Sequence, residues 1–252
     1  VFIVGFKGSA KTNSDIFYIP IDYATIQEAI NHANEGDTIF VYNGTYHEHV
    51  VVNKSVSLVG EGIRTTVIDG NRTGIVIDIV KSNSNITGFT IRNSGAYYPG
   101  IHLSNVNHCN IYDNNIIEND GFGIMLSSSS NNSISGNNVT ANGAFGIWLG
   151  YSSNNCISGN NITNNNWDGI YLSSFSNYND ISGNNITNNR TGIWLYFSSN
   201  HNSISGNNLT NNIHEGMWLG GSSNNNSICR NNIVNNRGGI RLYSFISYNR
   251  IV

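Results

Sequence analysis

The chain has little of what most function classes depend on. Charged residues make up 11% of its 252 residues, with 12 Lys and Arg against 15 Asp and Glu, whereas soluble domains carry about 25% charge. A net charge of −3 offers no basic surface for nucleic acid. No stretch reaches the roughly 18 apolar residues that a membrane helix requires. We therefore expect neither a nucleic-acid partner nor a transmembrane segment.

Cysteine and proline are also scarce. The three cysteines, Cys109, Cys156 and Cys229, stand at unrelated spacings, which argues against a disulfide framework or a cysteine metal site. We expect them to be small, buried apolar residues. The chain begins with Val1 and not with Met, which is typical of a mature protein whose signal peptide has been removed. We therefore expect an extracellular or cell-surface location.

Asparagine and isoleucine, in contrast, are abundant, with 47 and 34 residues. Asn side chains compete for backbone hydrogen bonds, so this content disfavours long helices. A hydrophobic share of 38% is too high for a disordered chain. The composition predicts an all-β, turn-rich and repetitive protein.

A repeat of 23 residues organises most of the chain. The pattern Gly-Ile-x-Leu, once with Met for Ile, starts at Gly100, Gly123, Gly146, Gly169, Gly192, Gly216 and Gly239. Two more apolar positions follow in each period, separated by Ser- and Asn-rich turns. Three short strands in each period can bury their apolar faces only by stacking on neighbouring repeats. We predict a single-stranded parallel β-helix of about ten coils spaced about 4.8 Å apart. A leucine-rich repeat would need a different spacing of Leu and Asn.

Asn recurs at fixed positions of this repeat. A parallel stack places equivalent side chains above one another, and Asn can both donate and accept along such a column. We therefore interpret the Asn columns as structural ladders at turns and not as binding sites. Two columns fit this pattern: Asn137, Asn160, Asn184, Asn207, Asn231, and Asn132, Asn155, Asn179, Asn202, Asn226.

The first third of the chain carries a second signature. Tyr23–Ile30 reads YATIQEAI, Gly44–Glu48 reads GTYHE, and Val56–Gly62 reads VSLVGEG. Together with the repeats, these segments resemble NosD-like, CASH-domain proteins with PbH1 repeats, within the pectin-lyase-like superfamily. The resemblance covers residues 15–252 and implies one right-handed β-helix domain with a short N-terminal capping helix from Thr25 to Ala33.

The resemblance does not carry an activity with it. Gly44, Tyr46 and Glu48 match the opening motif of pectin methylesterases, but the later catalytic segments of those enzymes have no counterpart. The Asp residues in the repeats occupy different columns, so no acid pair with glycosidase spacing emerges. We find no lyase or esterase catalytic set, name no catalytic residue or cofactor, and lean against an enzyme.

His47 and His49 are a weak metal candidate. Alternation along a strand would put both on one face, where two His could ligate a metal. NosD-like proteins are associated with copper-enzyme maturation, but the sequence shows no third ligand, so we predict no metal site. N-x-S/T motifs are frequent, and in an exported protein they are candidate glycosylation sites. We single out Asn43, Asn71, Asn138 and Asn161.

The variable position of Gly-Ile-x-Leu should point outward and holds three of the four tryptophans. A soluble monomer rarely exposes so much aromatic surface without using it. The aromatic stripe would serve assembly or glycan binding, unless a loop of the same chain covers it. Its residues are Trp148, Tyr171, Trp194 and Trp218, flanked by Phe145 and Tyr196.

The two ends led us to our main hypothesis. Residues 1–14 form an apolar extension in which Val1, Phe2, Ile3 and Val4 could add as a strand to a neighbour's open edge. The repeat also runs to Val252 without a cap. We therefore expect a cell-surface or extracellular structural protein that binds copies of itself and forms a filament, sheath or surface layer. The alternative is a carbohydrate-binding or polysaccharide-processing protein.

Overall fold

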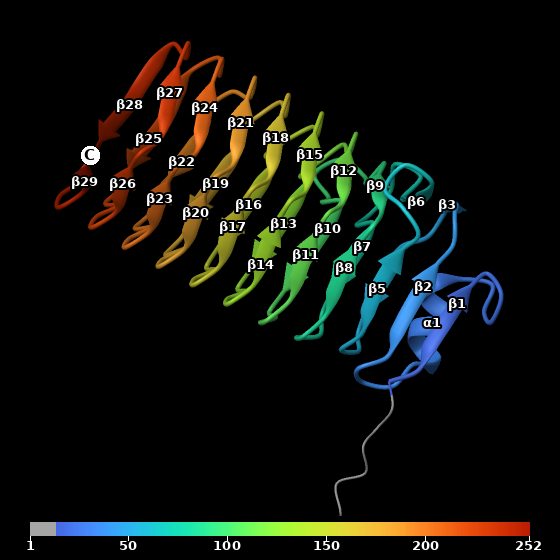
Figure 1. The fold of residues 1–252 in the computed structure, drawn as a ribbon. Coiled ribbons are helices and arrows are strands. Elements are labelled where there is room, and N and C mark those ends of the chain that lie inside the picture. Colours follow the sequence, from blue (N-terminus) through green and yellow to red (C-terminus); the bar gives the residue numbers. More distant parts are fainter. Residues whose placement is uncertain (1–13) are drawn as a thin grey trace, which may run out of the picture.

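The computed structural model describes residues 14–252, which form an elongated parallel β-helix (Figure 1). The extension that contains Val1, Phe2, Ile3 and Val4 lies outside the described residues, so its role as an added strand stays a prediction. Every strand pair in the described part is parallel, and each strand between the two ends of a sheet pairs with its equivalents in the coils before and after it. The predicted fold class is confirmed.

Three parallel sheets, here called A, B and C, form the sides of the helix. Sheet A contains β1 (Ile16–Ile19), β2 (Thr38–Val41), β5 (Ser57–Gly60), β8 (Asn85–Thr87), β11 (Asn110–Tyr112), β14 (Ser133–Ser135), β17 (Cys156–Ser158), β20 (Asp180–Ser182), β23 (Ser203–Ser205), β26 (Ser227–Cys229) and β29 (Arg250–Ile251). Sheet B contains β3 (Gly44–Tyr46), β6 (Thr66–Asp69), β9 (Thr90–Arg92), β12 (Asn115–Ile117), β15 (Asn138–Thr140), β18 (Asn161–Thr163), β21 (Asn185–Thr187), β24 (Asn208–Thr210) and β27 (Asn232–Val234). Sheet C contains β4 (Val50–Val52), β7 (Ile77–Ile79), β10 (Ile101–Ser104), β13 (Ile124–Ser127), β16 (Ile147–Gly150), β19 (Ile170–Ser173), β22 (Ile193–Leu195), β25 (Glu215–Gly220) and β28 (Gly238–Tyr243).

The core is a column of aliphatic side chains along the axis. In β16, Ile147 and Leu149 are fully buried and Trp148 between them points outward, as alternation along a strand requires. Ile157 of sheet A and Ile162 of sheet B fill the other two sides of the same coil. The repeated Ile and Leu therefore contact their equivalents above and below, and no strand needs a core of its own.

Buried Asn ladders close the turns. Asn160 donates from Nδ2 to Asn184 Oδ1 at 3.0 Å and to the Ile134 carbonyl at 2.9 Å. Its Oδ1 accepts from the backbone N–H and from Nδ2 of Asn137, at 3.0 and 3.1 Å. Both predicted columns are confirmed as ladders of this kind. A third ladder, which we did not predict as such, runs through Asn119, Asn142, Asn165, Asn189, Asn212 and Asn236.

The residue before each ladder Asn turns the chain. Asn164 and Asn188 have φ of 56° and 57°, and each precedes a buried ladder Asn. Gly159 and Gly183 do the same in another ladder, with φ of 63° and 64°. Gly and Asn tolerate this left-handed backbone better than other residues. Asn-Asn pairs such as Asn164-Asn165 and Asn188-Asn189 therefore combine a left-handed turn residue with a hydrogen-bonded ladder residue.

The helix α1 (Ile26–His32) covers the N-terminal end of the coil stack (Figure 1). Thr25 is its N-cap and accepts from the Glu28 N–H, while the Glu48 carboxylate accepts from Ile26 and Gln27, both at 3.0 Å. Ile26 and Ile30 face the core and are fully buried. The predicted capping helix is confirmed. No helix among residues 14–252 is long and apolar enough to span a membrane.

The cysteine prediction holds at one position only. Cys109 is buried, and burial raises the pKa of its thiol. Cys156 and Cys229 are partly exposed because they take outward positions of β17 and β26, where several equivalent residues are Ser. Our prediction of burial is wrong for these two, since their column and not their hydrophobicity sets their direction.

We predict that Asn160→Ala destabilises the protein by about 3 kcal/mol, because it strands the Ile134 carbonyl and the Asn137 N–H in the interior. Asn161→Ala, one residue later on the outer face, should change the free energy of unfolding by no more than about 0.5 kcal/mol. Chemical denaturation of both variants checks this. Equal effects would show that the inner ladder is not what holds the coils together.

Candidate functional site

A column of aromatic side chains runs along the outer face of sheet C. Trp148, Tyr171, Trp194 and Trp218 are direct Cα partners on successive strands. The rings of Tyr171 and Trp194 stack with centroids 4.8 Å apart, and those of Trp194 and Trp218 with centroids 5.0 Å apart. The coil spacing of about 4.8 Å sets these distances. The sequence prediction of one aligned stripe therefore agrees with the register.

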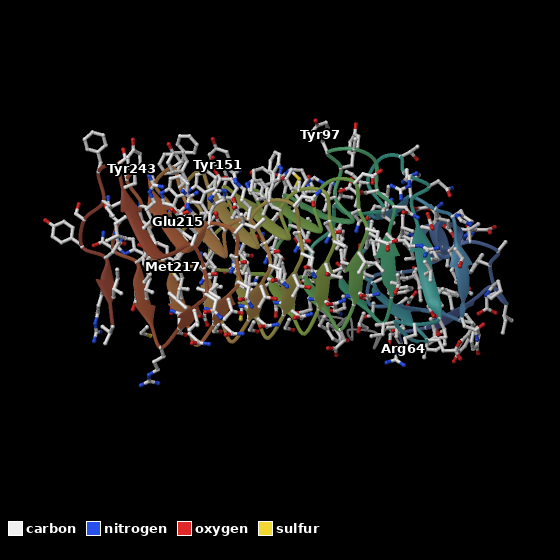
Figure 2. All side chains as sticks on the ribbon, turned by 90° about the horizontal axis from the view of Figure 1, so that it is seen from above. Arg64, Tyr97, Tyr151, Glu215, Met217 and Tyr243 are labelled. Atoms are coloured by element: carbon white, nitrogen blue, oxygen red, sulfur yellow. The ribbon has the colours of Figure 1, made fainter. Side chains whose placement is uncertain are left out.

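The stripe is half-buried, because its own rings cover one another. Phe145 is only 8% exposed and packs against Tyr171, with ring centroids 4.7 Å apart. Tyr196 lies against Trp194 at 5.4 Å. More exposed rings lie at the edge of sheet C, with Tyr151 directly after β16 and Tyr243 at the end of β28. Figure 2 shows both on the same side of the molecule.

The indole N–H groups of the stripe differ in their partners. Trp148 donates to Ser173 Oγ on the next coil at 3.0 Å. The equivalent positions one coil beyond Trp194 and Trp218 hold Gly220 and Tyr243, and the buried N–H groups of these two tryptophans have no partner. An unpaired buried donor costs about 1–3 kcal/mol. This end of the stripe therefore carries unused hydrogen-bonding capacity.

A cavity of about 370 Å³ opens beside this end of the stripe. It lies where the chain enters sheet C, at the position before the repeated Gly. Phe122 and Phe145 occupy that position in earlier coils, whereas Asp168, Thr191 and Gly238 are smaller and leave space. The lining consists of Asp168, Arg190, Thr191, Trp194, His214, Glu215, Trp218, Arg237, Gly238 and Arg241.

Asp168 is the buried acid of the cavity, with only 1% of its surface exposed. Its Oδ1 accepts from the Thr191 N–H at 3.0 Å, and its Oδ2 is buried without a partner. Burial raises the pKa of this carboxyl group, and the Thr191 hydrogen bond and the Arg190 charge offset part of the rise. A carboxyl group of this kind holds its proton to a higher pH than an exposed one.

Arginines surround the mouth of the cavity. The Arg241 guanidinium lies 4.7 Å from the centre of the Trp218 ring and binds Glu215 Oε1 at 3.2 Å. Arg190 and Arg237 are exposed, and neither has a carboxylate within ion-pair distance among residues 14–252. The cavity thus combines two stacked indole rings with cations that are available to a ligand.

The sequence pointed to only part of this site. Trp194 and Trp218 are where we expected them, but the polar lining was missed. We predicted no acid pair in the repeats, because Asp168 and the other Asp residues there occupy different columns. Glu215 does share the column of Asp168 two coils later, as the ladder from Asp168 through Thr191 shows. Comparing all acidic residues in the 23-residue register would have revealed the pair.

Comparison with known proteins assigns the chain to a family. The model of the family described as periplasmic copper-binding protein (NosD) matches residues 30–217. The chain belongs to the NosD family. No protein of curated function matches its sequence.

Solved structures that resemble this NosD-family chain include proteins named for polysaccharides. The A-module of the mannuronan C-5 epimerase AlgE4 of Azotobacter vinelandii aligns with a TM-score of 0.79 at 18% identity, over 90% of this chain and 72% of that one. The pectate lyase Pel9A aligns with a TM-score of 0.70 at 13% identity, over 94% and 78%. An alginate lyase from Paenibacillus sp. str. FPU-7 aligns with a TM-score of 0.58 at 14% identity, over 94% and 99%. At these identities the likeness establishes the shared fold.

The family description names copper, and the described residues do not fit a copper site. Nowhere in residues 14–252 do three His, Cys, Asp or Glu side chains gather closely enough to hold a metal ion. Our placement of His47 and His49 in a strand is wrong, because β3 ends at Tyr46 and β4 begins at Val50. Both ring nitrogens of His49 are engaged, by the Ile75 carbonyl at 2.6 Å and by Thr73 Oγ1 at 3.0 Å. We derive no step that involves copper.

The candidate glycosylation sites lie on the outer surface. Asn43, Asn71 and Asn161 are exposed, and Asn138 is half-buried. The last two belong to an outer Asn ladder, in which Asn161 Nδ2 donates to Asn138 Oδ1 at 2.8 Å. Because glycosylation would modify this nitrogen, the ladder competes with it. All four sites stay predictions.

We predict that Asp168→Asn stabilises the protein at neutral pH. The raised pKa means that the folded state binds this proton more tightly than the unfolded state, so stability is lost as pH rises from the unfolded pKa through the folded pKa. Asn keeps an acceptor for the Thr191 N–H and removes the buried charge. Thermal unfolding from pH 4 to pH 8 should show a gain over the parent chain that grows with pH. A gain independent of pH would contradict this origin.

Proposed function

We propose that this NosD-family chain binds a polysaccharide in the periplasm or outside the cell, with the aromatic stripe of sheet C as its sugar platform. The observation that carries the proposal is the stacked column from Trp148 to Trp218, which ends at a cavity lined by charged groups. Aromatic rings give flat apolar faces on which sugar rings can lie. A cavity of this volume, with a few polar groups beside apolar walls, has the size of a small-ligand site.

The structural relatives support the choice of ligand class. Their names place them on mannuronan, pectate and alginate, three polysaccharides, and they share the β-helix over most of this chain. The family description names the periplasm, which supports the proposed location. These comparisons favour our alternative hypothesis over the self-assembling structural protein that we put first.

The charges at the cavity favour an acidic polysaccharide. A guanidinium group binds a carboxylate with two parallel hydrogen bonds. Arg190 and Arg237 stand at the mouth without such a partner among residues 14–252. The two acids of the cavity are not free at its surface, because Asp168 is buried and Glu215 is already paired with Arg241. A sugar carboxylate at the mouth would bind these cations while its ring lies on Trp194 or Trp218.

We predict that Trp194→Ala and Trp218→Ala each weaken binding of polymannuronate or polygalacturonate oligosaccharides by at least about tenfold, as loss of a stacking residue does at a binding hot spot. Arg190→Ala with Arg237→Ala should reduce the preference for these oligomers over neutral dextran. Isothermal titration calorimetry measures both effects. Tyr112→Ala, on the outer face of sheet A, is the matched aromatic control. Failure of the parent chain to bind any of these glycans would refute the proposal.

Self-association remains a second candidate function, because one row of aromatic side chains is strongly exposed. Tyr151, Phe175 and Phe197 are 64%, 59% and 55% exposed and line a hollow of about 470 Å³ beside sheet C. Aromatic residues in such a position are typical of interfaces between proteins. If copies meet there, light scattering should show a mass that rises with concentration and falls in Phe175→Ser. A constant monomer mass in the parent chain would exclude this function.

A further inference from the structure

A second polar constellation lies on sheet C, at the other end of the column from the cavity. His102 Nδ1 lies 3.0 Å from Asp78 Oδ1, and His102 Nε2 lies 3.1 Å from Ser127 Oγ. The imidazole thus joins a carboxylate on one side to a hydroxyl on the other. This is the arrangement of a nucleophile, a general base and a residue that orients the base.

The register of the β-helix brings the three residues together. Asp78 of β7 and His102 of β10 are direct Cα partners, and His102 pairs in turn with Met125 of β13. Ser127 ends β13, two residues after Met125, so its side chain emerges on the same outer face. The side chains of His102 and Asp78 are 16% and 28% exposed. They are held by their neighbours and still open to a ligand.

The proton positions follow from the donor and acceptor chemistry. An ionised Asp78 can only accept, so His102 Nδ1 carries the hydrogen in that contact. In the neutral ring, Nε2 then presents its lone pair and accepts from the Ser127 hydroxyl. This tautomer is the one that can take a proton from the serine.

We propose that Asp78, His102 and Ser127 form a catalytic triad that hydrolyses ester substituents, such as acetyl groups, on a bound polysaccharide. Ser127 and His102 are the catalytic residues, and Asp78 is the positioning residue. The polymeric substrate rests on the function proposed above, whereas the ester chemistry rests on the triad alone.

The reaction needs no reactant besides water. Ser127 Oγ attacks the acyl carbon while His102 Nε2 takes the hydroxyl proton. The bond from the acyl carbon to the sugar oxygen breaks, and His102 returns the proton to that oxygen, which leaves a free sugar hydroxyl and an acylated serine. Water then loses a proton to His102 Nε2 and attacks the acyl carbon. The bond from the acyl carbon to Ser127 Oγ breaks, His102 returns the proton to that oxygen, and the carboxylic acid leaves, which restores the hydroxyl of Ser127 and the neutral imidazole.

The position of the triad favours a substituent on a polymer over a free small ester. Met125 is the Cα partner of both His102 and Trp148, so the triad lies beside the first tryptophan of the aromatic stripe. A chain that follows the stripe beyond Trp148 would pass over Ser127. The triad and the cavity would then act on different sugars of one polymer.

A fluorophosphonate probe separates a nucleophile from a serine that only supports the surface. It should label Ser127, identified by peptide mass spectrometry, and Ser127→Ala should abolish the labelling. Ser104→Ala is the matched control, because Ser104 is the Cα partner of Ser127 one coil earlier. Among residues 14–252, the only hydrogen bond of its hydroxyl is the one that it accepts from the Asn105 amide. Labelling at other serines only, or labelling unaffected by Ser127→Ala, would overturn the proposal.

Hydrolysis of p-nitrophenyl acetate tests the roles of the other two residues. His102→Ala should lower kcat by about 10²-fold or more, the size of a general-base contribution. Asp78→Asn should lower kcat by about tenfold or more and leave KM unchanged, because it disturbs the tautomer and not the binding of the ester. Thermal unfolding verifies that each variant is folded. Folded variants with the activity of the parent chain would refute the triad.

Acetylated polymannuronate distinguishes failure of the triad from failure of the proposed function. We expect acetate release that depends on Ser127. Binding of the polymer without acetate release or probe labelling would overturn the triad and leave the binding function standing. Probe labelling and small-ester hydrolysis without binding of any polysaccharide would support the triad and refute the polymeric substrate.

Discussion

The hydrogen bonds between stacked Asn side chains are the interaction on which the rest of the structure depends. Each buried amide hydrogen-bonds the backbone of the preceding coil and the Asn of the next coil, as Asn137, Asn160 and Asn184 show. An unpaired amide in that position would cost about 1–3 kcal/mol of folding free energy, so a shift of one coil relative to the next is unfavourable. Because the ladders hold the register, every outward position forms a straight column. The aromatic stripe, the cavity and the triad are all consequences of that alignment.

The candidate sites of this molecule therefore differ only in which residues occupy the successive positions of a column. After Val51, the outward column of sheet C holds Asp78, His102 and Met125, and it then runs through the aromatic rings to Arg241. Every step is a direct Cα pair. The outer faces of sheets A and B carry mostly Ser, Thr and Asn in the regular coils, as in β14 and β15. One face therefore concentrates the aromatic rings and reactive groups.

The sequence alone was sufficient to predict the features that recur in every coil. It was insufficient to predict the sites formed by residues that depart from the repeat. The Gly-Ile-x-Leu spacing predicted the coils, the inward Ile and Leu, and the alignment of Trp148 with Trp194. The triad was missed, because Asp78, His102 and Ser127 are 24 and 25 residues apart and meet only when one coil is laid on the next. The prediction that His47 and His49 share one strand face was wrong for the opposite reason. It applied strand alternation to residues that lie beyond the end of β3.

Buried polar atoms without hydrogen-bond partners, which lower the stability of the fold, lie mainly at the proposed sugar-binding site. Among residues 14–252, four buried side-chain nitrogen or oxygen atoms have no hydrogen-bond partner, and three of them belong to Asp168, Trp194 and Trp218. Ser173 accepts from the Trp148 indole, whereas the position equivalent to Ser173 one coil beyond Trp194 is Gly220, which has no hydroxyl to offer. A purely structural column would be more stable if these polar atoms were hydrogen-bonded as completely as those of the Asn ladders are. Local rules are most often broken where a ligand completes the site, which favours a bound molecule at this end of sheet C over a face that serves only to hold the coils together.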